Sequence, residues 1–360
     1  MTSGYLILET GETFSGNLIG ADIEVEGEVV FNTSMTGYQE MITDPSYKGQ
    51  ILTFCYPIIG NYGINEQDNE SEELAVSGVI MNDLCEEPSH YQSTASLSQK
   101  LKHANIPGLV NIDTRALVAV IRKHGTVSGK IVKTKKAQRS SWHKPNAIQL
   151  VHSVSVKKDE SYGYGEPHIV MVDFGYKKSI LQALLDQGCR VSIVPWNTTM
   201  DYIRALNPDG VLISNGPGDP MELTEVFPTI KAITEQYPTL GICLGHQLIV
   251  LSYGGRTTKM PFGHRGGNHP VKDLITGKVQ MTSQNHGYVV VEDSVDSEQF
   301  QIVFKNVNDQ SVEGVKHVRL PVQSVQFHPE AHPGPSDSAY IFTDFIGQVL
   351  AARGRKYVTA

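Results

Sequence analysis

A cysteine between two glycines, at the junction of two apolar runs, constrains the fold of this 360-residue chain more than any other feature. The segment is Gly241-Ile242-Cys243-Leu244-Gly245. The pattern Gly-x-Cys-x-Gly predicts a sharp turn from a strand into a helix, with the cysteine at its tip, and the glycines are needed because Cβ atoms there would collide. A thiol at a helix N-terminus faces unpaired N–H groups and the positive end of the helix dipole, which both favour the thiolate.

A histidine and a carboxylate that could act on this cysteine lie near the other end of the chain. They occur in the segment Gln326-Phe327-His328-Pro329-Glu330. His328 and Glu330 are two residues apart, so both side chains project from one face if the chain is extended there. Together with Cys243 they would make an acyl-transfer triad.

The order of apolar segments around Cys243 predicts the fold class. From His168 onward, runs typical of buried strands (168–173, 190–195 and 210–214) alternate with helical segments. This alternation predicts an α/β domain with a mainly parallel sheet covered by helices on both faces. Such sheets bind ligands at the carboxyl ends of their strands, and both Cys243 and the loop 215–220 follow predicted strands.

The first half of the chain is expected to be a separate, strand-rich domain. Strands are predicted within 5–16, 28–33 and 51–56, and helices within 93–104 and 114–124. A basic, polar stretch follows, which we interpret as a solvated connection or a face packed on an acidic partner rather than a nucleic-acid contact. The expected domains are therefore 1–132, a linker region 133–167, and 168–360.

Composition restricts the classes of function. The net charge of −8 argues against a nucleic-acid-binding surface, and there is no apolar run of about 18 residues that could span a membrane. The N-terminus lacks the pattern of a secretory signal. The four cysteines form no Cys-x-x-Cys pair, and Cys55, Cys85 and Cys189 are interpreted as small buried hydrophobes, so a cytoplasmic location is expected.

Three motifs resemble a known domain, the class I glutamine amidotransferase. They are Gly216-Pro217-Gly218-Asp219-Pro220, the cysteine turn and His328-Pro329-Glu330, in this order. The N-terminal half is similar to the small subunit of carbamoyl-phosphate synthase, and the resemblance covers essentially the whole chain. The segments that carry this second likeness are 32–40, 43–47, 56–63 and 262–271. The resemblance implies an amidotransferase domain preceded by a smaller strand-rich α/β domain that contacts the large subunit.

The resemblance also implies an activity, the hydrolysis of L-glutamine to glutamate and ammonia. Cys243 would attack the side-chain amide and form a γ-glutamyl thioester, with His328 as general acid/base and Glu330 orienting it. The glutamine-binding residues implied by the family are Ser46, Gly216, Gly218, Leu244, Gln247, Asn285, Gly287 and Tyr288. The family more often has phenylalanine at the position of Tyr288, and because Ser46 lies in the first domain, the substrate would be held at the domain boundary.

The resemblance implies a partner and places the cofactors there. Ammonia would pass to the large subunit, which makes carbamoyl phosphate from bicarbonate with ATP; ATP and a divalent metal are expected in that subunit and no cofactor in this chain. This chain has no Gly-x-x-x-x-Gly-Lys-Ser/Thr loop. No metal site is expected, because His246, His264, His269 and His286 include no pair at i, i+4 spacing.

Two other functions are weighed against this one. An amidotransferase for another acceptor would need only the part of the chain after His168, so the N-terminal half favours the carbamoyl-phosphate synthase family. A silent scaffold that only binds and regulates a synthetase has no need for an intact Cys243, His328 and Glu330. The sequence leaves open arginine or pyrimidine synthesis, the effectors, the rate without the large subunit, and whether heterodimers form a higher oligomer.

Overall fold

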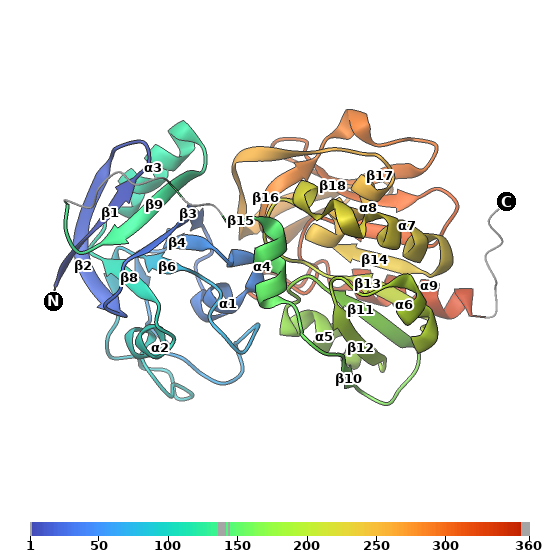
Figure 1. Ribbon diagram of the computed structural model, residues 1–360, viewed down its shortest axis with the longest axis horizontal. Coiled ribbons are helices and arrows are strands. Elements are labelled where there is room, and N and C mark those ends of the chain that lie inside the picture. Colours follow the sequence, from blue (N-terminus) through green and yellow to red (C-terminus); the bar gives the residue numbers. More distant parts are fainter. Residues whose placement is uncertain (1, 136–141, 143–144, 354–360) are drawn as a thin grey trace. The chain divides into compact units, whose positions relative to one another are not determined.

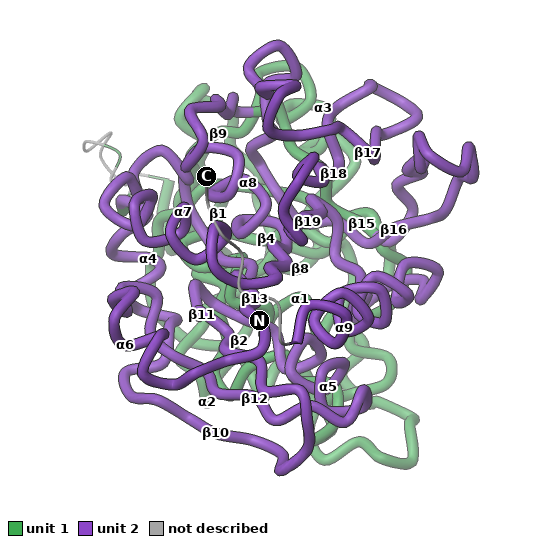
Figure 2. Tube along the Cα trace, turned by 90° about the vertical axis from the view of Figure 1, so that its right-hand side faces the viewer, with its two compact units in different colours: residues 1–145, 260–266 green, residues 146–259, 267–360 purple. Residues whose placement is uncertain are grey.

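The computed structural model describes residues 2–135, 142 and 145–353, and it divides into two compact units (Figure 2). Unit 1 comprises residues 1–145 with 260–266, and unit 2 comprises 146–259 with 267–360. The basic part of the expected linker, 136–141 and 143–144, lies outside the described residues. Of the described residues of that stretch, 133–135, 142 and 145 belong to unit 1. Residues 146–167 belong to unit 2, where they contain α4 (Ala147–Val154) and β10 (Glu160–Tyr162).

Unit 1 is built on a closed barrel of strands in the order β1-β2-β8-β6-β4-β3-β9 (Figure 1). The strands are β1 (Ser3–Leu8), β2 (Thr13–Gly20), β3 (Val25–Asn32), β4 (Gln50–Phe54), β6 (Gly78–Ile80), β8 (Pro107–Val110) and β9 (Val127–Val132). The run from β3 through β4 and β6 to β8 is parallel, and the other pairs are antiparallel. The expected strand-rich domain is confirmed; its closure into a barrel was not predicted, because pairing between distant strands leaves no local signal.

Short helices and one small sheet complete unit 1. They are α1 (Tyr38–Thr43), η1 (Pro45–Tyr47), α2 (Leu97–His103), α3 (Thr114–His124) and the pair β5 (Ile58–Ile59) with β7 (Asp83–Leu84). The Asp113 side chain caps α3 by accepting a hydrogen bond from the N–H of Ala116 at 2.8 Å. The same helix buries Leu117 and Ile121, whose i, i+4 spacing gave the sequence its helical signal.

Unit 2 contains one large mixed sheet, with ten strands among the described residues. The order is β10-β12-β11-β13-β14-β19-β18-β17-β15-β16, and the run from β12 to β19 is parallel. Its strands after β10 are β11 (His168–Asp173), β12 (Arg190–Pro195), β13 (Gly210–Ile213), β14 (Thr239–Ile242), β15 (Thr257–Asp273), β16 (Val279–Val290), β17 (Phe300–Asn306), β18 (Val312–His317) and β19 (Val322–Val325). The strands β18, β17 and β15 extend the parallel part in antiparallel fashion.

Helices cover both faces of the parallel part, as the sequence predicted. Alternate residues of β11 enter different cores: Val170 and Val172 pack with α6, α7 and α8, whereas Ile169 and Met171 pack with α5 and α9. The remaining elements of unit 2 are α5 (Lys178–Asp186), α6 (Met200–Leu206), η2 (Pro220–Val226), α7 (Phe227–Gln236), α8 (Leu244–Ser252), η3 (Glu292–Ser294) and α9 (Tyr340–Ala352). The predicted α/β fold class is confirmed.

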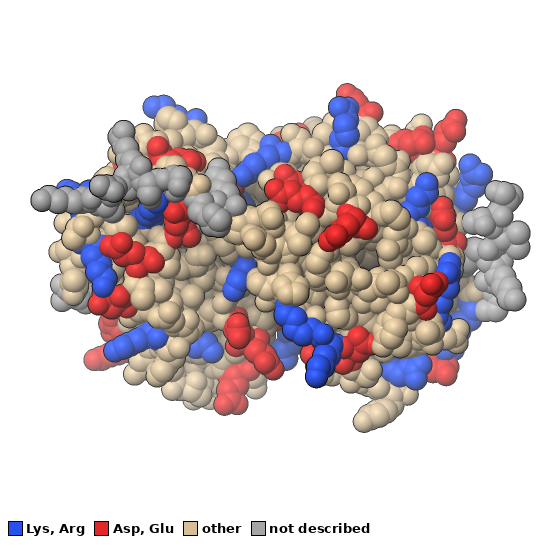
Figure 3. Space-filling model, viewed as in Figure 1, with Lys and Arg blue, Asp and Glu red and all other residues tan. Residues whose placement is uncertain are grey.

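Two features of the structure relate to the charge and hydropathy of the sequence. On the face seen in Figure 3, acidic and basic side chains are interspersed over both units. Within the described ranges, no helix combines the length and the apolar character that crossing a bilayer requires.

Candidate active site

Cys243 lies at the tip of a strained turn between β14 and α8. Its backbone angles, φ 52° and ψ −102°, are rare for a residue with a side chain and cost on the order of 1–3 kcal/mol. The two flanking glycines are required by packing. A Cβ on Gly245 would lie 2.2 Å from the carbonyl oxygen of Ile213, and one on Gly241 would lie 2.8 Å from the backbone of Gly245. The structure therefore contains the strand–turn–helix that the sequence predicts.

The backbone of the turn includes one N–H, that of Leu244, which the helix does not use. The N–H of Cys243 donates to the carbonyl of Val325 at 2.8 Å, which ties the turn to the end of β19. The carbonyl of Cys243 accepts the N–H of Gln247 at 3.3 Å, the first bond in the ladder of α8. The N–H of Leu244 precedes that ladder and has no partner within the helix, so it is available to an anion beside Cys243.

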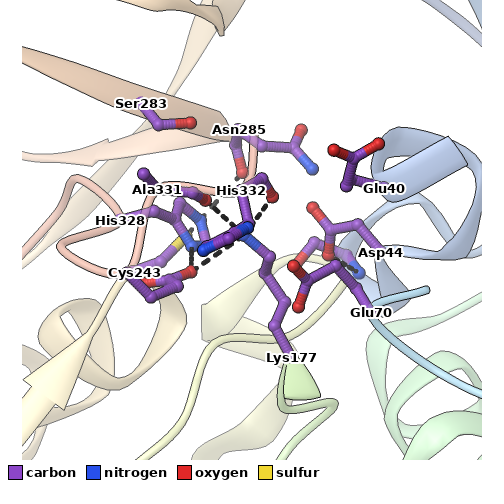
Figure 4. Close-up of polar contacts among 12 residues, drawn as sticks. Glu40, Asp44, Glu70, Lys177, Cys243, Ser283, Asn285, His328, Ala331 and His332 are labelled. Carbon is purple, nitrogen blue, oxygen red and sulfur yellow. Dashed lines mark hydrogen bonds and ion pairs between the residues drawn. The ribbon is translucent and has the colours of Figure 1, made fainter. Parts of the chain in front are cut away.

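His328 and Glu330 form a buried pair that a lysine extends, and Figure 4 shows His328 and this lysine, Lys177. His328 Nδ1 and Glu330 Oε1 are 2.5 Å apart, and Lys177 Nζ lies 3.1 Å from the same carboxylate oxygen. The side chains of these residues are at most 3% exposed. Lys177 Nζ also donates to the carbonyls of Ala331 at 2.6 Å and His332 at 2.7 Å, so the segment carrying Glu330 is fixed at three acceptors.

These contacts favour the charged forms of both members of the pair. Burial alone would lower the pKa of His328, but Glu330 and the sulfur of Cys243 outweigh burial and raise that pKa well above 6.5. Burial alone would raise the pKa of Glu330, but Lys177 and His328 outweigh it and hold that pKa well below 4.5. Both shifts stabilise an imidazolium beside a carboxylate, which is the form that His328 takes once it has accepted the proton of a thiol.

The geometry assigns different partners to the two ring nitrogens of His328. Nδ1 is occupied by Glu330, which leaves Nε2 for the thiol. Figure 4 shows the Cys243 side chain beside the His328 ring, and the sulfur is among the groups that stabilise the protonated ring. A base held in one orientation next to a thiol is what nucleophilic catalysis by cysteine requires.

Four of the predicted glutamine-binding residues of unit 2 lie on β16 or on the first turn of α8. Asn285, Gly287 and Tyr288 lie on β16, and the carbonyl of Asn285 accepts a hydrogen bond from Cys243 Sγ at 3.7 Å. Gln247 lies on the first turn of α8, and its Nε2 donates to the carbonyl of Tyr288 at 2.8 Å. Their contacts with glutamine remain predictions.

The glycine loop after β13 is packed too closely to accept larger residues. A Cβ on Gly216 would lie 2.3 Å from the carbonyl oxygen of Phe174. Gly218 has φ +97°, and its Cβ would lie 2.6 Å from that of Ala147 on α4. This loop is joined to the cysteine turn, since Gly245 N–H donates to the carbonyl of Ser214 at 3.1 Å. Close packing explains why glycine is required at both positions. Their role in binding glutamine remains a prediction.

Ser46 belongs to unit 1 and is described with that unit alone. It is buried on η1, where its N–H donates to the carboxylate of Asp44 at 2.9 Å. This contact is the Asx-type turn that the sequence Asp44-Pro45-Ser46 predicts. Its part in glutamine binding remains a prediction.

Two of the histidines near the motifs are engaged in hydrogen bonds. His286 Nδ1 lies 2.8 Å from the carbonyl of Tyr288, and its Nε2 lies 2.7 Å from Gln284 Oε1. His246 Nδ1 lies 2.8 Å from Ser324 Oγ, and burial lowers its pKa to about 3, so this ring is neutral. Hydrogen bonds therefore hold both rings in place.

Sequence reasoning missed two polar side chains at this site, Lys177 and Gln326. Lys177 follows β11, and the carboxyl end of a parallel strand was a signal that could have indicated it. Gln326 precedes His328 by two residues, so the alternation that paired His328 with Glu330 also included Gln326. Its Nε2 donates to Cys243 Sγ at 3.6 Å.

Comparison with known proteins identifies both halves of the chain. Residues 170–348 match the family model described as glutamine amidotransferase class-I, and residues 6–131 match the carbamoyl-phosphate synthase small chain, CPSase domain. The arginine-specific small chain of carbamoyl phosphate synthase from Bacillus subtilis is 50% identical over 97% of this chain and 98% of its own length.

Two further relatives give the same result. The arginine-specific small chain from Geobacillus stearothermophilus is 51% identical over 96% of this chain and 97% of its own length. The carbamoyl phosphate synthase small chain from Listeria monocytogenes is 48% identical over 96% of both chains. With a cysteine turn and a buried His–Glu pair inside the amidotransferase match, this chain belongs to the small-chain family of glutamine-hydrolysing carbamoyl-phosphate synthase.

Proposed function

We propose that this small chain hydrolyses glutamine through Cys243, His328 and Glu330. The observation that carries the proposal is the buried His328–Glu330 pair, which holds one ring nitrogen and leaves the other for a thiol at a strained turn. A buried carboxylate that fixes the orientation of a histidine and stabilises its charged form is the arrangement of acyl-transfer triads.

The proposed first half-reaction forms a thioester. His328 Nε2 takes the proton of the Cys243 thiol, and the thiolate attacks the side-chain carbonyl carbon of glutamine. The oxyanion of the tetrahedral intermediate accepts the N–H of Leu244, with a second donor expected from the loop of Gly216 and Gly218. His328 then protonates the amide nitrogen, the carbon–nitrogen bond breaks, and ammonia leaves.

The second half-reaction regenerates the enzyme. His328 takes a proton from water, and the hydroxide attacks the thioester carbonyl. The carbon–sulfur bond breaks, glutamate is released, and the proton returns to the Cys243 sulfur. Gln247, Asn285, Gly287 and Tyr288 are proposed to hold the amino-acid end of glutamine, together with Ser46.

The ammonia is proposed to be used by a large subunit. That partner would combine it with bicarbonate at the expense of ATP to make carbamoyl phosphate. Since two relatives at 50–51% identity are named arginine-specific, we infer that the product serves arginine synthesis. We also infer that the subunits work in the cytoplasm.

The test is ammonia release from glutamine by wild type and Cys243→Ser, each with and without a carbamoyl-phosphate synthase large subunit, ATP and bicarbonate. We expect hydrolysis by wild type that the large subunit accelerates, and none by the variant. Hydrolysis that persists in Cys243→Ser would overturn the triad. Hydrolysis unchanged by the large subunit would favour an amidotransferase for another acceptor, and its complete absence would favour a regulatory scaffold.

A further inference from the structure

The side-chain amide of Gln326 contacts the nucleophile and is not part of the triad. Gln326 directly follows β19 and is completely buried. Its Nε2 donates to Cys243 Sγ at 3.6 Å, within range for a hydrogen bond to sulfur. This contact places a fixed N–H dipole next to the atom that becomes negatively charged during catalysis.

The orientation of this amide is dictated by a chain of hydrogen bonds. The carbonyl of Tyr288 can only accept, so the group of Gln247 that faces it at 2.8 Å must be the NH₂. The second N–H of that NH₂ meets Gln326 at 2.9 Å and therefore requires the amide oxygen there. With its oxygen directed at Gln247, Gln326 presents its own NH₂ to the sulfur.

The surroundings of the sulfur differ between its two protonation states. The thiol form donates to the carbonyl of Asn285 at 3.7 Å, and this bond is lost when the proton leaves. The Gln326 N–H gains strength at the same moment, because a donor binds an anion more strongly than a neutral acceptor. Gln326 thus acts selectively on the charged form of Cys243.

We propose that Gln326 stabilises the thiolate of Cys243 through its Nε2–H, and that Gln247 is a positioning residue that keeps the Gln326 amide in that orientation. The inference rests on the proposed function, since it assigns a device to the proposed nucleophile. In this proposal Gln247 has two roles, since its side chain orients Gln326 and is also expected to contact glutamine.

The local backbone does not depend on this side chain. The N–H of Gln326 donates to the carbonyl of Glu313 at 2.8 Å, and this bond remains whatever the side chain is. Gln326→Met keeps the length of the side chain and removes the donor. Gln326→Glu keeps the shape and places a carboxylate beside the sulfur.

The experiment measures the rate at which iodoacetamide alkylates Cys243 as a function of pH, followed on the Cys243 peptide by mass spectrometry. Gln323→Met is the matched control, since Gln323 lies on β19 and its amide oxygen is bonded to Gln348 Nε2 at 3.1 Å. Circular dichroism melting of each variant separates unfolding from a local effect. Alkylation needs no glutamine turnover, so the test is independent of whether the chain proves to be a glutaminase.

For Gln326→Met we expect the midpoint of the alkylation profile to rise by about one pH unit, with a roughly tenfold lower rate at pH 7. Gln326→Glu should move the midpoint further, because two negative charges then face each other. Gln323→Met should leave it unchanged. A folded Gln326→Met or Gln326→Glu protein with the wild-type midpoint would overturn the proposal, and so would an equal shift in the control.

Discussion

Two cysteines of unit 2 are equally buried and border the same apolar core, but only Cys243 also has the polar contacts of the site. Cys189 and Cys243 are each 2% exposed. Cys189 precedes β12, packs in the apolar core with α5, and burial raises its pKa to about 11. The sulfur of Cys243 follows β14 and meets a glutamine amide, a backbone carbonyl and the His328 ring.

The difference follows from which end of a parallel strand each cysteine occupies. Cys189 lies at the amino end of its strand, where apolar side chains close the core. Cys243 lies at the carboxyl end, where loops from several strands meet and polar side chains converge. Exposure alone therefore does not distinguish a structural thiol from a reactive one; the neighbouring groups do.

Serine substitution of each cysteine in turn should give the largest difference between them, which we expect in the rate of glutamine hydrolysis. Cys243→Ser is expected to lower glutamine hydrolysis by about 10³-fold or more, because a neutral hydroxyl is a much weaker nucleophile in a site shaped for sulfur. Cys189→Ser should change it less than about twofold. The measurement is ammonia release at saturating glutamine, and comparable losses in both variants would remove the distinction.

Removing the Glu330 carboxylate tests how the surroundings of Cys243 contribute to catalysis. Glu330→Gln should lower kcat about 10²-fold, since it no longer stabilises the imidazolium or fixes the ring. Glu292→Gln is the control, because Glu292 is half-exposed and pairs with Lys305 on the surface. Steady-state kinetics distinguish the cases, and a Glu330→Gln enzyme with wild-type kcat would contradict the assigned role.

The His328–Glu330 pair should make the free energy of unfolding depend on pH, whereas Cys189 should not. The lowered pKa of Glu330 stabilises the folded protein fully above pH 4.5, the ordinary pKa of a glutamate. This stabilisation is lost as the pH falls through the pKa of Glu330 in the folded protein. The raised pKa of His328 contributes stability below 6.5, and this is lost as pH rises through the folded pKa. Both contributions are complete between these two values.

Glu330→Gln should therefore destabilise the protein most between about pH 4.5 and 6.5, by about 3–5 kcal/mol, because Lys177 is left buried without its carboxylate. Cys189→Ser should show a difference from wild type that is constant over the same range, since its thiol stays neutral. Denaturant unfolding at several pH values checks both, and a Glu330→Gln effect that is flat with pH would refute the ion pair.

The smallest expected effects come from the glycines beside the two cysteines. Gly245→Ala should cost about 1–3 kcal/mol, because its Cβ would lie 2.2 Å from a backbone oxygen. Gly188 has φ +80° with no atom within 4 Å of a Cβ, so Gly188→Ala should cost only about 1 kcal/mol of conformational strain. Thermal melting compares them, and equal costs would show that the cysteine turn is not tightly packed.

The sequence predicted the parallel part of the sheet and the turn at Cys243 because both have local signals. Buried runs such as 168–173 and the glycines around Cys243 are visible without knowing their neighbours. The closed barrel of unit 1, the antiparallel strands β15, β17 and β18 and the role of Lys177 depend on residues far apart in the chain. Gln326 is an intermediate case, since its alternation with His328 was visible but its amide orientation depends on Gln247 and Tyr288.

The most direct test of the account is to trap the acyl-enzyme. Wild type and Cys243→Ser are mixed with glutamine, quenched in acid within the first turnovers and digested for mass spectrometry. The account predicts one glutamyl group on the Cys243 peptide of wild type and none on the peptides of Cys55, Cys85, Cys189 or the variant. A hydrolysing enzyme whose glutamyl group is bound to another residue would contradict it.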